Sequence, residues 1–411
     1  MRIIVKILKN IPIVILDFMF LPIWKFCGIV RRKENLWIFV SWFGTKYNDS
    51  SRIFFEWINT NHQEINAIWL SRDSKIVKKI REKGYKAYNT KSLKAKLYTL
   101  KAKNIFTTTG YEMFYGFTNG ANIIELWHGM PLKKILRDDE FSSAGLNKNL
   151  LYRILHSLNN KCFKWKNITT LPNLYTCTSS DFFTPFLRTA FGLDDTKILK
   201  TGLPRNDALF YNNKESIISD IRAKFQNCKI ILYMPTFRNS SWTKKPFNCF
   251  SAEYSFDKEK FASVLSDNNL VFVYKPHFYD LEFIKNINIS DRFVLIDDNS
   301  YDELYNFIGL CDVLITDYSS VYFDFIITKK EVILAPFDLE TYLKTCRSQY
   351  FDYSEMIGSK VKNWEELLNN LLELHSNNID DAAINKFSQY SDGNSCEKLY
   401  RFIKNELFIT N

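Results

Sequence analysis

The sequence has few of the residues from which metal and disulfide sites are built. Its 411 residues include eight cysteines and five histidines. The cysteines are scattered without a C-x-x-C pair, and no histidine stands at ligand spacing to them, so no metal site is predicted. Dispersed thiols of this kind fit a reducing, cytoplasmic compartment better than a disulfide framework does.

A long uncharged apolar run is also missing. Residues 3–30 are mostly apolar, but charged residues and prolines interrupt them, namely Lys6, Lys9, Pro12, Asp17, Pro22 and Lys25. No stretch reaches the roughly 18–20 residues that span a bilayer, and the two prolines break the helical pattern. No small-residue cleavage site follows, which disfavours a signal peptide. With basic residues at both ends, residues 1–33 are predicted to lie on an anionic membrane surface. A core helix of the first domain is the alternative, and a transmembrane anchor is disfavoured more strongly.

Charge is distributed unevenly along the chain. Residues 1–200 carry 32 lysines and arginines against 15 acidic residues, whereas residues 201–411 carry 23 against 30. The first half is therefore expected to attract an anionic membrane or another polyanion. Five lysines without an acid fall in residues 91–103, and eight basic residues against three acids fall in residues 131–166. Since no zinc-finger, ribonucleoprotein or basic-zipper pattern accompanies this charge, nucleic acid is not expected as a partner.

Apolar strand patterns alternate with helical patterns along the chain. The expected strands of the first half are Leu36–Val40, Ala67–Leu70, Ile105–Thr108, Ile123–Leu126 and Leu174–Thr178. Those of the second half are Ile230–Met234, Leu270–Tyr274, Val294–Ile296, Val313–Thr316 and Val332–Ala335. Helices are expected at Arg52–Asn59, around Phe261–Leu265, at Ser300–Gly309 with Ser300 as the N-cap, and at Ser320–Lys330. The alternation predicts an α/β fold of two Rossmann-like halves, 34–204 and 205–411, after the N-terminal segment.

Two histidines follow strands, one in each predicted half. In parallel α/β sheets, ligands bind beyond the carboxyl ends of the strands. His128 comes shortly after Ile123–Leu126, and Pro131 behind it suits the first turn of a helix. His277 stands in the corresponding position of the second half, with Lys275 two residues before it. A neutral imidazole there could accept a proton from an attacking hydroxyl group, although either histidine could instead be satisfied within its own loop.

Hydroxyl and guanidinium groups near other strand ends suggest phosphate binding. Ser319 and Ser320 follow the strand Val313–Thr316, where backbone N–H groups are free at the start of the next helix. Arg205 lies between the two halves and Arg238 follows another strand, and guanidinium groups bind phosphate oxygens in pairs. Ordinary N-capping by the serines and salt bridges of the arginines are the alternatives.

Five segments carry a resemblance to a known family. They are Trp127–Lys134, Gly202–Asp207, Pro235–Arg238, Lys275–His277 and Leu314–Ser320. In these segments, and over residues 36–403, the chain resembles the CDP-glycerol glycerophosphotransferases, the primases and polymerases of teichoic-acid-type polymers. Met130 stands where that family usually has threonine, and Ile357–Ser359 stands where a Pro-Gly-Pro run is common. Because of these two departures, the resemblance does not determine which donor and which acceptor the protein uses.

The resemblance implies a fold and a site. The fold is glycosyltransferase-B-like, with an acceptor and membrane domain at 34–204 facing a CDP-donor domain at 205–411 across a central cleft. His128 and His277 would serve catalysis, and no cofactor is implied. The donor-binding residues would be Gly129, Pro131, Arg205, Thr236, Arg238, Lys275, Thr316, Asp317, Ser319 and Ser320. The residues toward the acceptor or membrane would be Lys133, Lys134 and Arg137.

The resemblance also implies a reaction. An acceptor hydroxyl group would attack the β-phosphorus of CDP-glycerol or a related CDP-activated polyol, releasing CMP. His128 would be the general base, and His277 with Lys275 would stabilise the diphosphate or protonate the leaving group. The acceptor would be an anionic lipid-linked molecule, used by a peripheral protein at the cytoplasmic face of the cell membrane. A nucleotide-sugar glycosyltransferase of capsule or lipopolysaccharide synthesis and a non-catalytic membrane scaffold are the alternatives.

Overall fold

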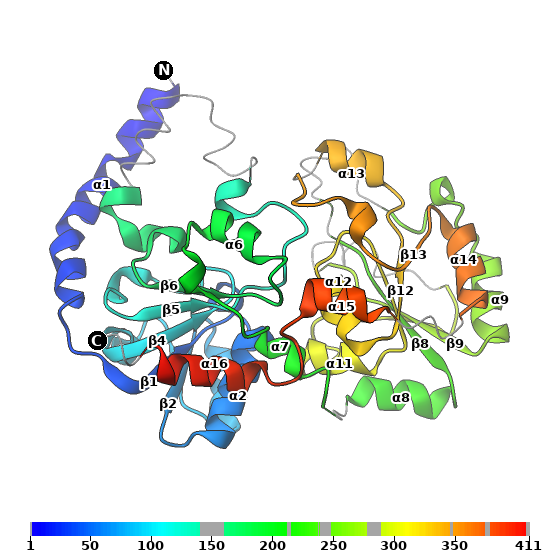
Figure 1. Ribbon diagram of the computed structural model, residues 1–411, viewed down its shortest axis with the longest axis horizontal. Coiled ribbons are helices and arrows are strands. Elements are labelled where there is room, and N and C mark those ends of the chain that lie inside the picture. Colours follow the sequence, from blue (N-terminus) through cyan, green and yellow to red (C-terminus); the bar gives the residue numbers. More distant parts are fainter. Residues whose placement is uncertain are drawn as a thin grey trace.

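The computed structural model describes residues 2–139, 160–211, 215–236, 238, 248–277, 289–345, 348–374 and 379–407, and of residues 2–14, 216 and 345 the backbone alone. The basic stretch 131–166 therefore lies partly outside the described residues. Two parallel sheets form the framework, one in each half of the chain (Figure 1). This confirms the predicted α/β architecture of two Rossmann-like halves.

The first sheet contains seven strands in the order β3-β2-β1-β4-β5-β6-β7. The strands are β1 (Lys33–Phe39), β2 (Asn66–Ser71), β3 (Ala87–Asn89), β4 (Ala102–Thr107), β5 (Asn122–Glu125), β6 (Leu174–Cys177) and β7 (Ile198–Leu199). The helices of this half are α1 (Arg2–Cys27), α2 (Asp49–Asn61), α3 (Ser74–Glu82), α4 (Leu93–Lys101), α6 (Thr184–Phe191) and α7 (Pro204–Asp207). Buried apolar runs form these strands because both faces of the sheet are covered.

The second sheet contains six strands in the order β10-β9-β8-β11-β12-β13. They are β8 (Lys229–Met234), β9 (Leu270–Tyr274), β10 (Phe293–Leu295), β11 (Val313–Thr316), β12 (Glu331–Leu334) and β13 (Ser359–Lys360). The helices are α8 (Ser216–Lys224), α9 (Lys258–Asp267), α11 (Leu304–Leu310), α12 (Val321–Phe325), α13 (Leu339–Thr345), α14 (Trp364–Leu372), α15 (Asp381–Ser388) and α16 (Ser395–Asn405). The strand order reverses beside β1 in the first sheet and beside β8 in the second, and ligands of such folds bind at these switch points.

Aromatic side chains fill the core of each half. In the first, Phe39 of β1 stacks on Phe106 of β4 with ring centroids 4.6 Å apart, and Trp37 is fully buried beside them. In the second, the ring centroids of Trp364 in α14 and Phe261 in α9 lie 5.3 Å apart, and Trp364 covers the sheet. One face of the second sheet has a core of its own around Trp364, whereas the residues of its other face join the core of the first half in one continuous cluster.

Aromatic rings join the halves along one side. Phe183 of α6 lies 5.0 Å from Phe323 of α12, and Phe186 stacks on Tyr350 at 4.7 Å. The backbone also crosses between the halves, because the N–H of Tyr350 donates to the carbonyl of Leu132 at 2.9 Å. This crossing corrects the expectation that Pro131 begins a helix. The segment is extended there and pairs with the second half, which uses the backbone groups that a helix would have used.

Two other helix predictions are corrected at their ends. The helix expected from Ser300 begins at Leu304, since the Ser300 hydroxyl donates to Asp297 Oδ1 at 2.9 Å and holds a turn instead. The helix expected over 320–330 leaves α-helical geometry after Phe325, continues as a 3₁₀ turn and ends at Lys329 with a φ of 60°.

Helix α1 continues through both prolines that were expected to break it. Around Pro22, Phe20 and Trp24 pack against Trp165 with centroid distances of 5.4 and 5.5 Å, and these contacts hold the helix on the first domain. The opposite side exposes apolar residues, namely Ile15, Leu16, Phe18, Met19, Ile23 and Phe26. None of the helices in the described part of the chain has the length and apolar character needed to cross a bilayer.

The last helix returns to the first half. In α16, Tyr400 stacks on His62 at 3.6 Å and donates a hydrogen bond to Glu64 at 2.9 Å, and α16 lies beside α2 in Figure 1. A division at residues 204 and 205 separates the two sheets, although it falls within α7, which packs on α2 of the first half. We keep it as a proposal for the domain boundary, with α16 counted with the first domain.

Candidate active site

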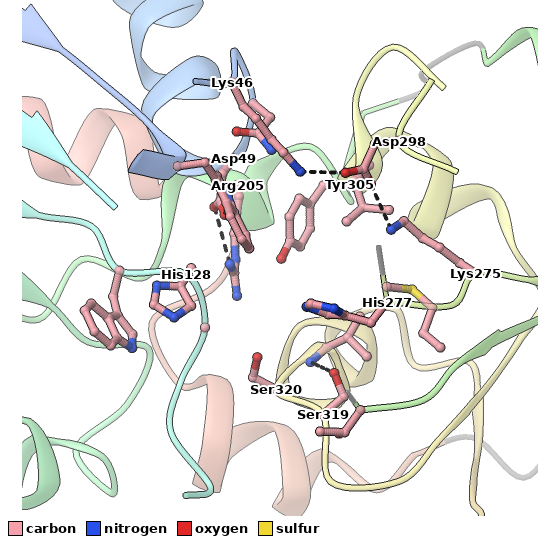
Figure 2. Close-up of a pocket in the computed structure, with 18 of the residues that line it drawn as sticks. Lys46, Asp49, His128, Arg205, Lys275, His277, Asp298, Tyr305, Ser319 and Ser320 are labelled. Atoms are coloured by element: carbon pink, nitrogen blue, oxygen red, sulfur yellow. Dashed lines mark hydrogen bonds and ion pairs between the residues drawn. The ribbon is translucent and has the colours of Figure 1, made fainter. Parts of the chain in front are cut away.

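A cavity of about 750 Å³ lies between the two halves, where the loops that follow β1, β5, β8, β9 and β11 meet. Ten of the predicted site residues line it: His128, Gly129, Pro131, Lys133, Arg205, Thr236, Lys275, His277, Ser319 and Ser320. Five others lie outside its lining: Lys134, Arg137, Arg238, Thr316 and Asp317. His128 and His277 come from opposite sides of the cavity, with Arg205 and Ser320 between them (Figure 2).

His128 is held by one ring nitrogen. Its Nδ1 lies 2.8 Å from the carbonyl oxygen of Thr108, and since a carbonyl only accepts, Nδ1 carries the proton and donates. The neutral ring therefore has its lone pair on Nε2. Burial lowers the pKa of His128 below its ordinary value of 6.5, so the neutral form prevails at pH 7. A neutral imidazole with a free lone pair can act as a general base.

Two buried carboxyl groups fix the backbone around His128. Glu112 accepts a hydrogen bond from the Thr108 N–H at 2.7 Å, which orients the loop that holds Nδ1. Glu125 accepts from the Trp127 N–H at 3.0 Å and thereby holds Trp127 at a φ of 53°, in the left-handed region that costs a non-glycine residue energy. Burial raises the pKa of Glu125 well above its ordinary value. These carboxyl groups act through backbone groups and do not line the cavity.

His277 lies in a different electrostatic environment. Burial, together with the positive charge of Lys275, lowers the pKa of His277 to about 4. Lys275 pairs with Asp298 at 3.1 Å, and Lys46 of the first half reaches the same carboxylate at 2.5 Å. Although burial opposes them, the two lysines lower the pKa of Asp298. The lysines lie at the cavity wall with one carboxylate between them, so an anion bound beside His277 would meet a net positive charge.

Arg205 lines the cavity and is held there by contacts with both halves. Its guanidinium pairs with Asp324 at 2.7 Å and with Asp49 at 3.3 Å, and it lies 4.7 Å from the centroid of the Tyr305 ring. Burial alone would lower the pKa of Arg205, but the two carboxylates outweigh it and raise that pKa. The Nε–H group is buried without a hydrogen-bond partner. Arg205 is therefore fixed at the cavity wall by two acids and by the face of the Tyr305 ring.

Glycine is required where the loop of His128 approaches the second half. Gly129 has a φ of 139°, and a Cβ there would lie 2.3 Å from the Ser320 hydroxyl and 3.1 Å from Arg205. Ser320 stands at the N-cap position of α12 without making a side-chain cap, while Ser319 accepts from the Val321 N–H at 3.4 Å. Thr236 adds a buried hydroxyl that has no hydrogen-bond partner. Several hydroxyl and N–H groups thus converge on one part of the cavity.

Arg238 does not reach the cavity, which corrects the expectation that it binds phosphate directly. Its guanidinium pairs with Asp317 and with Asp338, each at 2.6 Å, and it lies 4.9 Å from the ring of Tyr318. Asp317 in turn accepts from the N–H of Thr236 at 2.8 Å. Arg238 and Asp317 therefore support the cavity wall from behind and position Thr236.

We expect Arg238→Ala to destabilise the fold rather than to weaken ligand binding alone. The change leaves Asp317 and Asp338 without their buried partner, and breaking such a pair costs roughly 3 kcal/mol of unfolding free energy. Urea denaturation followed by circular dichroism measures the loss. Arg238→Lys keeps the charge but not the paired geometry. Its unfolding free energy should therefore lie between those of the unaltered chain and of Arg238→Ala. An unchanged midpoint for Arg238→Ala would contradict this role.

The three cations predicted to face the acceptor or the membrane are separated. Lys133 lines the cavity and lies 5.7 Å from the ring of Tyr342. The backbone N–H of Lys134 donates to Ser348 across the halves at 2.8 Å. Arg137 is exposed and donates to the carbonyl of Thr169. Only Lys133 lies where it could contact a molecule bound in the cavity.

Several charged residues in or beside the cavity were not predicted from the sequence, and four of them make the contacts described above. Lys46 and Asp49 follow β1, Asp298 follows β10 and Asp324 lies within α12. Examining the residues after every strand would have found the first three, because each stands just beyond a carboxyl end. Nothing in the local pattern distinguishes Asp324. Among the described residues, no group of three or more His, Cys, Asp and Glu side chains could hold a metal ion.

The sequence and the fold are similar to those of known proteins. The profile of the family described as CDP-Glycerol:Poly(glycerophosphate) glycerophosphotransferase matches residues 24–405. The chain is 28% identical over 383 residues to the teichoic acid poly(glycerol phosphate) polymerase of Bacillus subtilis (strain 168), covering 90% of this chain and 48% of that protein. It is 28% identical over 385 residues to the teichoic acid glycerol-phosphate transferase of Staphylococcus aureus (strain NCTC 8325 / PS 47), covering 90% and 93%. The solved structure of the wall teichoic acid polymerase TagF matches with a TM-score of 0.72 and 21% identity, over 99% of this chain and 98% of that chain.

Proposed function

Because the chain belongs to the CDP-glycerol:poly(glycerophosphate) glycerophosphotransferase family, we propose that it transfers glycerol phosphate from CDP-glycerol to a lipid-linked acceptor in teichoic-acid-type polymer synthesis. The observation that carries the proposal is the pair of neutral histidines on opposite walls of one cavity, with fixed cations between them. The chain spans about half the length of the Bacillus subtilis polymerase, so the activity of that whole protein is not assumed.

The proposed reaction needs one base and a site for a diphosphate. Nε2 of His128 takes the proton of the acceptor hydroxyl, whose oxygen attacks the β-phosphorus of CDP-glycerol. The bond between this phosphorus and the bridging oxygen breaks, CMP departs and a phosphodiester forms. Reactions of this kind depend on positioning and on neutralisation of charge. The tether of Nδ1 to Thr108 at 2.8 Å supports the assignment of the base.

The donor is proposed to lie against the second domain. Lys275 and Lys46 would neutralise the diphosphate, and the positive charge of Arg205 at the cavity wall would add to this attraction. The hydroxyls of Ser319, Ser320 and Thr236 would complete the contacts. Gly129 and Pro131 would leave room for the phosphates, and Thr316 and Asp317 would support the wall. His277 would receive negative charge from the diphosphate, which favours its protonated form, and could then protonate the leaving CMP.

Product analysis tests this function. The protein is incubated with CDP-glycerol and a synthetic lipid-diphosphate disaccharide, and CMP release and mass of the lipid product are measured. We expect the acceptor to gain glycerol phosphate units while CMP forms in equal amount. Parallel incubations with CDP-ribitol and UDP-sugars identify the donor. Transfer from a UDP-sugar alone would overturn the proposal in favour of a glycosyltransferase.

A membrane surface is proposed on the first domain, at the cytoplasmic face of the cell membrane. The apolar side chains of α1 form one part of it, since Met19 and Leu16 are 68% and 63% exposed. Phe114, which packs on Phe20 of α1 at 5.3 Å, extends it and is 52% exposed. Exposed apolar residues of this kind, with lysines nearby, suit peripheral attachment to an anionic leaflet.

Vesicle binding should separate the apolar and the electrostatic parts of this attachment. The unaltered chain is expected to sediment with anionic vesicles even at high salt. The triple variant Leu16→Ser, Met19→Ser and Phe26→Ser keeps the buried Trp24 and Cys27, so it should retain the fold. Its remaining attraction comes from basic residues worth on the order of 1 kcal/mol each near an anionic leaflet, and high salt should release it. Equal binding of the variant to neutral and anionic vesicles would exclude the electrostatic contribution.

A further inference from the structure

A second cavity, of about 640 Å³, lies on the first domain between α3 and α4. We call it the basic groove. Its lining includes the cations Lys78, Arg81 and Lys94, together with the polar side chains of Ser74 and Asn89. The groove shares no residue with the lining of the active-site cavity.

The cations of the basic groove are held near one another on an aromatic ring. The guanidinium of Arg81 lies 5.3 Å from the centroid of Tyr88, and the ammonium group of Lys94 lies 5.9 Å from the same ring. Glu82 is the one acid among the described residues that line the groove, and it pairs with Lys78 only at 3.8 Å in an exposed position. Such a pair is weak in water, so the groove keeps a positive potential.

Helix α3 separates the basic groove from the active-site cavity. Ile76 and Lys79 face the active-site cavity, whereas Lys78 and Arg81, on the next positions around the helix, face the groove. Cations therefore line both sides of one helix. An extended polyanion whose end lies near His128 would meet positive charge as it passed over α3.

Helix α4 forms the other wall and has two different faces. Lys94 points toward Tyr88 and the groove, while Leu93 and Leu97, one turn apart, are 72% and 47% exposed. Helices α4 and α1 both contact the turn at Tyr115–Phe117. The exposed leucines of α4 and the apolar side of α1 therefore lie on the same part of the domain, and the basic groove lies between that part and the active-site cavity.

We propose that the basic groove binds phosphodiester groups of the anionic acceptor polymer, in the stretch between its lipid anchor and its reacting hydroxyl. This inference rests on the proposed function. Under that function, the part of the polymer between the lipid anchor and the reacting hydroxyl runs from the membrane surface to the active-site cavity. Lysine and arginine bind phosphate oxygens, and the hydroxyl and amide groups of the groove supply further donors. A concave site suits a chain better than a flat layer of lipid headgroups, which the convex face with Leu93 and Leu97 fits instead.

The test compares acceptors of different length. The double variant Lys78→Ala and Lys94→Ala removes two exposed charges, so it should retain the fold, and Arg81→Lys checks the third cation without removing its charge. For an acceptor that carries several glycerol phosphate units, we expect the KM of the double variant to rise about tenfold, as for the loss of two phosphate contacts. The KM for CDP-glycerol and for an acceptor with a single unit should stay within about twofold.

A matched control removes the same charge elsewhere. Lys258 and Lys260 lie on the exposed face of α9 in the second domain. The double variant Lys258→Ala and Lys260→Ala should have the same KM as the unaltered chain with every acceptor. Equal KM changes for short and long acceptors, or equal changes in the control, would overturn the proposal.

A measurement without catalysis separates this inference from the proposed function. A labelled, water-soluble oligo(glycerol phosphate) is titrated with each variant and followed by fluorescence anisotropy. We expect binding by the unaltered chain, weakened about tenfold in the groove variant. Binding of each variant to anionic vesicles is measured in parallel. If the groove variant bound the oligomer as well as the unaltered chain does but no longer bound anionic vesicles, the groove would be a lipid site and the proposal would be overturned. Oligomer binding that depends on the groove, without any transfer from CDP-glycerol, would refute the proposed function alone.

Discussion

His128→Ala is expected to lower kcat by about a hundredfold or more, the usual loss when a general base is removed. The expectation rests on geometry, since Nδ1 donates to Thr108 and leaves the lone pair of Nε2 for the acceptor hydroxyl. The fold should not change, because the carboxyl groups of Glu112 and Glu125 hold the loop through backbone groups. Steady-state turnover with saturating CDP-glycerol and acceptor measures the loss.

The pH profile gives a second measure of the same role. Burial lowers the pKa of His128 below its ordinary value of 6.5, and a base acts only in its neutral form. With saturating CDP-glycerol, whose diphosphate favours protonated His277, the kcat of the unaltered enzyme should therefore fall as the pH decreases through the lowered pKa of His128. The alanine variant should lack this acidic limb. If the variant kept more than half of the turnover, the assignment of the base would be wrong.

His277→Ala is expected to cost a similar factor in kcat, about a hundredfold, but with a different signature. In the ligand-free protein its pKa is about 4, because of burial and of the charge of Lys275, so the ring is neutral at pH 7. A bound diphosphate places negative charge beside it and should raise that pKa. NMR titration of the His277 ring with and without CDP measures the rise, and the alanine variant identifies the signal.

A third histidine provides the control for both variants. His62 stacks on Tyr400 at 3.6 Å and does not line the active-site cavity, so His62→Gln should leave turnover within about twofold of the unaltered enzyme. A pKa of His277 that does not move when CDP binds would refute its contact with the diphosphate. Retention of more than half of the turnover by His277→Ala would refute its part in catalysis.

The central strands and the edge strand β10 could be predicted from the sequence, but the edge strands β3, β7 and β13 could not. Leu270–Tyr274 and Val313–Thr316 match the expected ranges residue for residue, because strands buried on both faces are nearly continuous apolar runs. The edge strands β7 and β13 have two residues each, which is too short for any periodic pattern. Their pairing depends on the neighbouring strand and not on their own residues.

The candidate site could be predicted only in part. His128 and His277 were recognised because each follows a central strand, and that position is fixed by the fold. Arg238 was misjudged because its partners Asp317 and Asp338 lie 79 and 100 residues away in the chain. The helix expected to begin at Pro131 was wrong for the same reason, since the segment that pairs with its loop comes from the second half. Local patterns report the strand ends well, but they do not report which charges will be neutralised by distant residues.

The return of α16 to the first domain has a consequence for synthesis on the ribosome. Tyr400 covers Trp37 and Trp57 with ring distances of 6.0 Å, and residues 395 and 396 donate their N–H groups to Asp207. The first domain is therefore incomplete until residues 395–405 have emerged, and at about 5–20 residues per second this leaves its aromatic surface open for tens of seconds after the last strand of its sheet. During that interval the nascent chain exposes the kind of surface that chaperones bind. Its folding should consequently depend on chaperones more than that of a protein whose domains are contiguous in sequence.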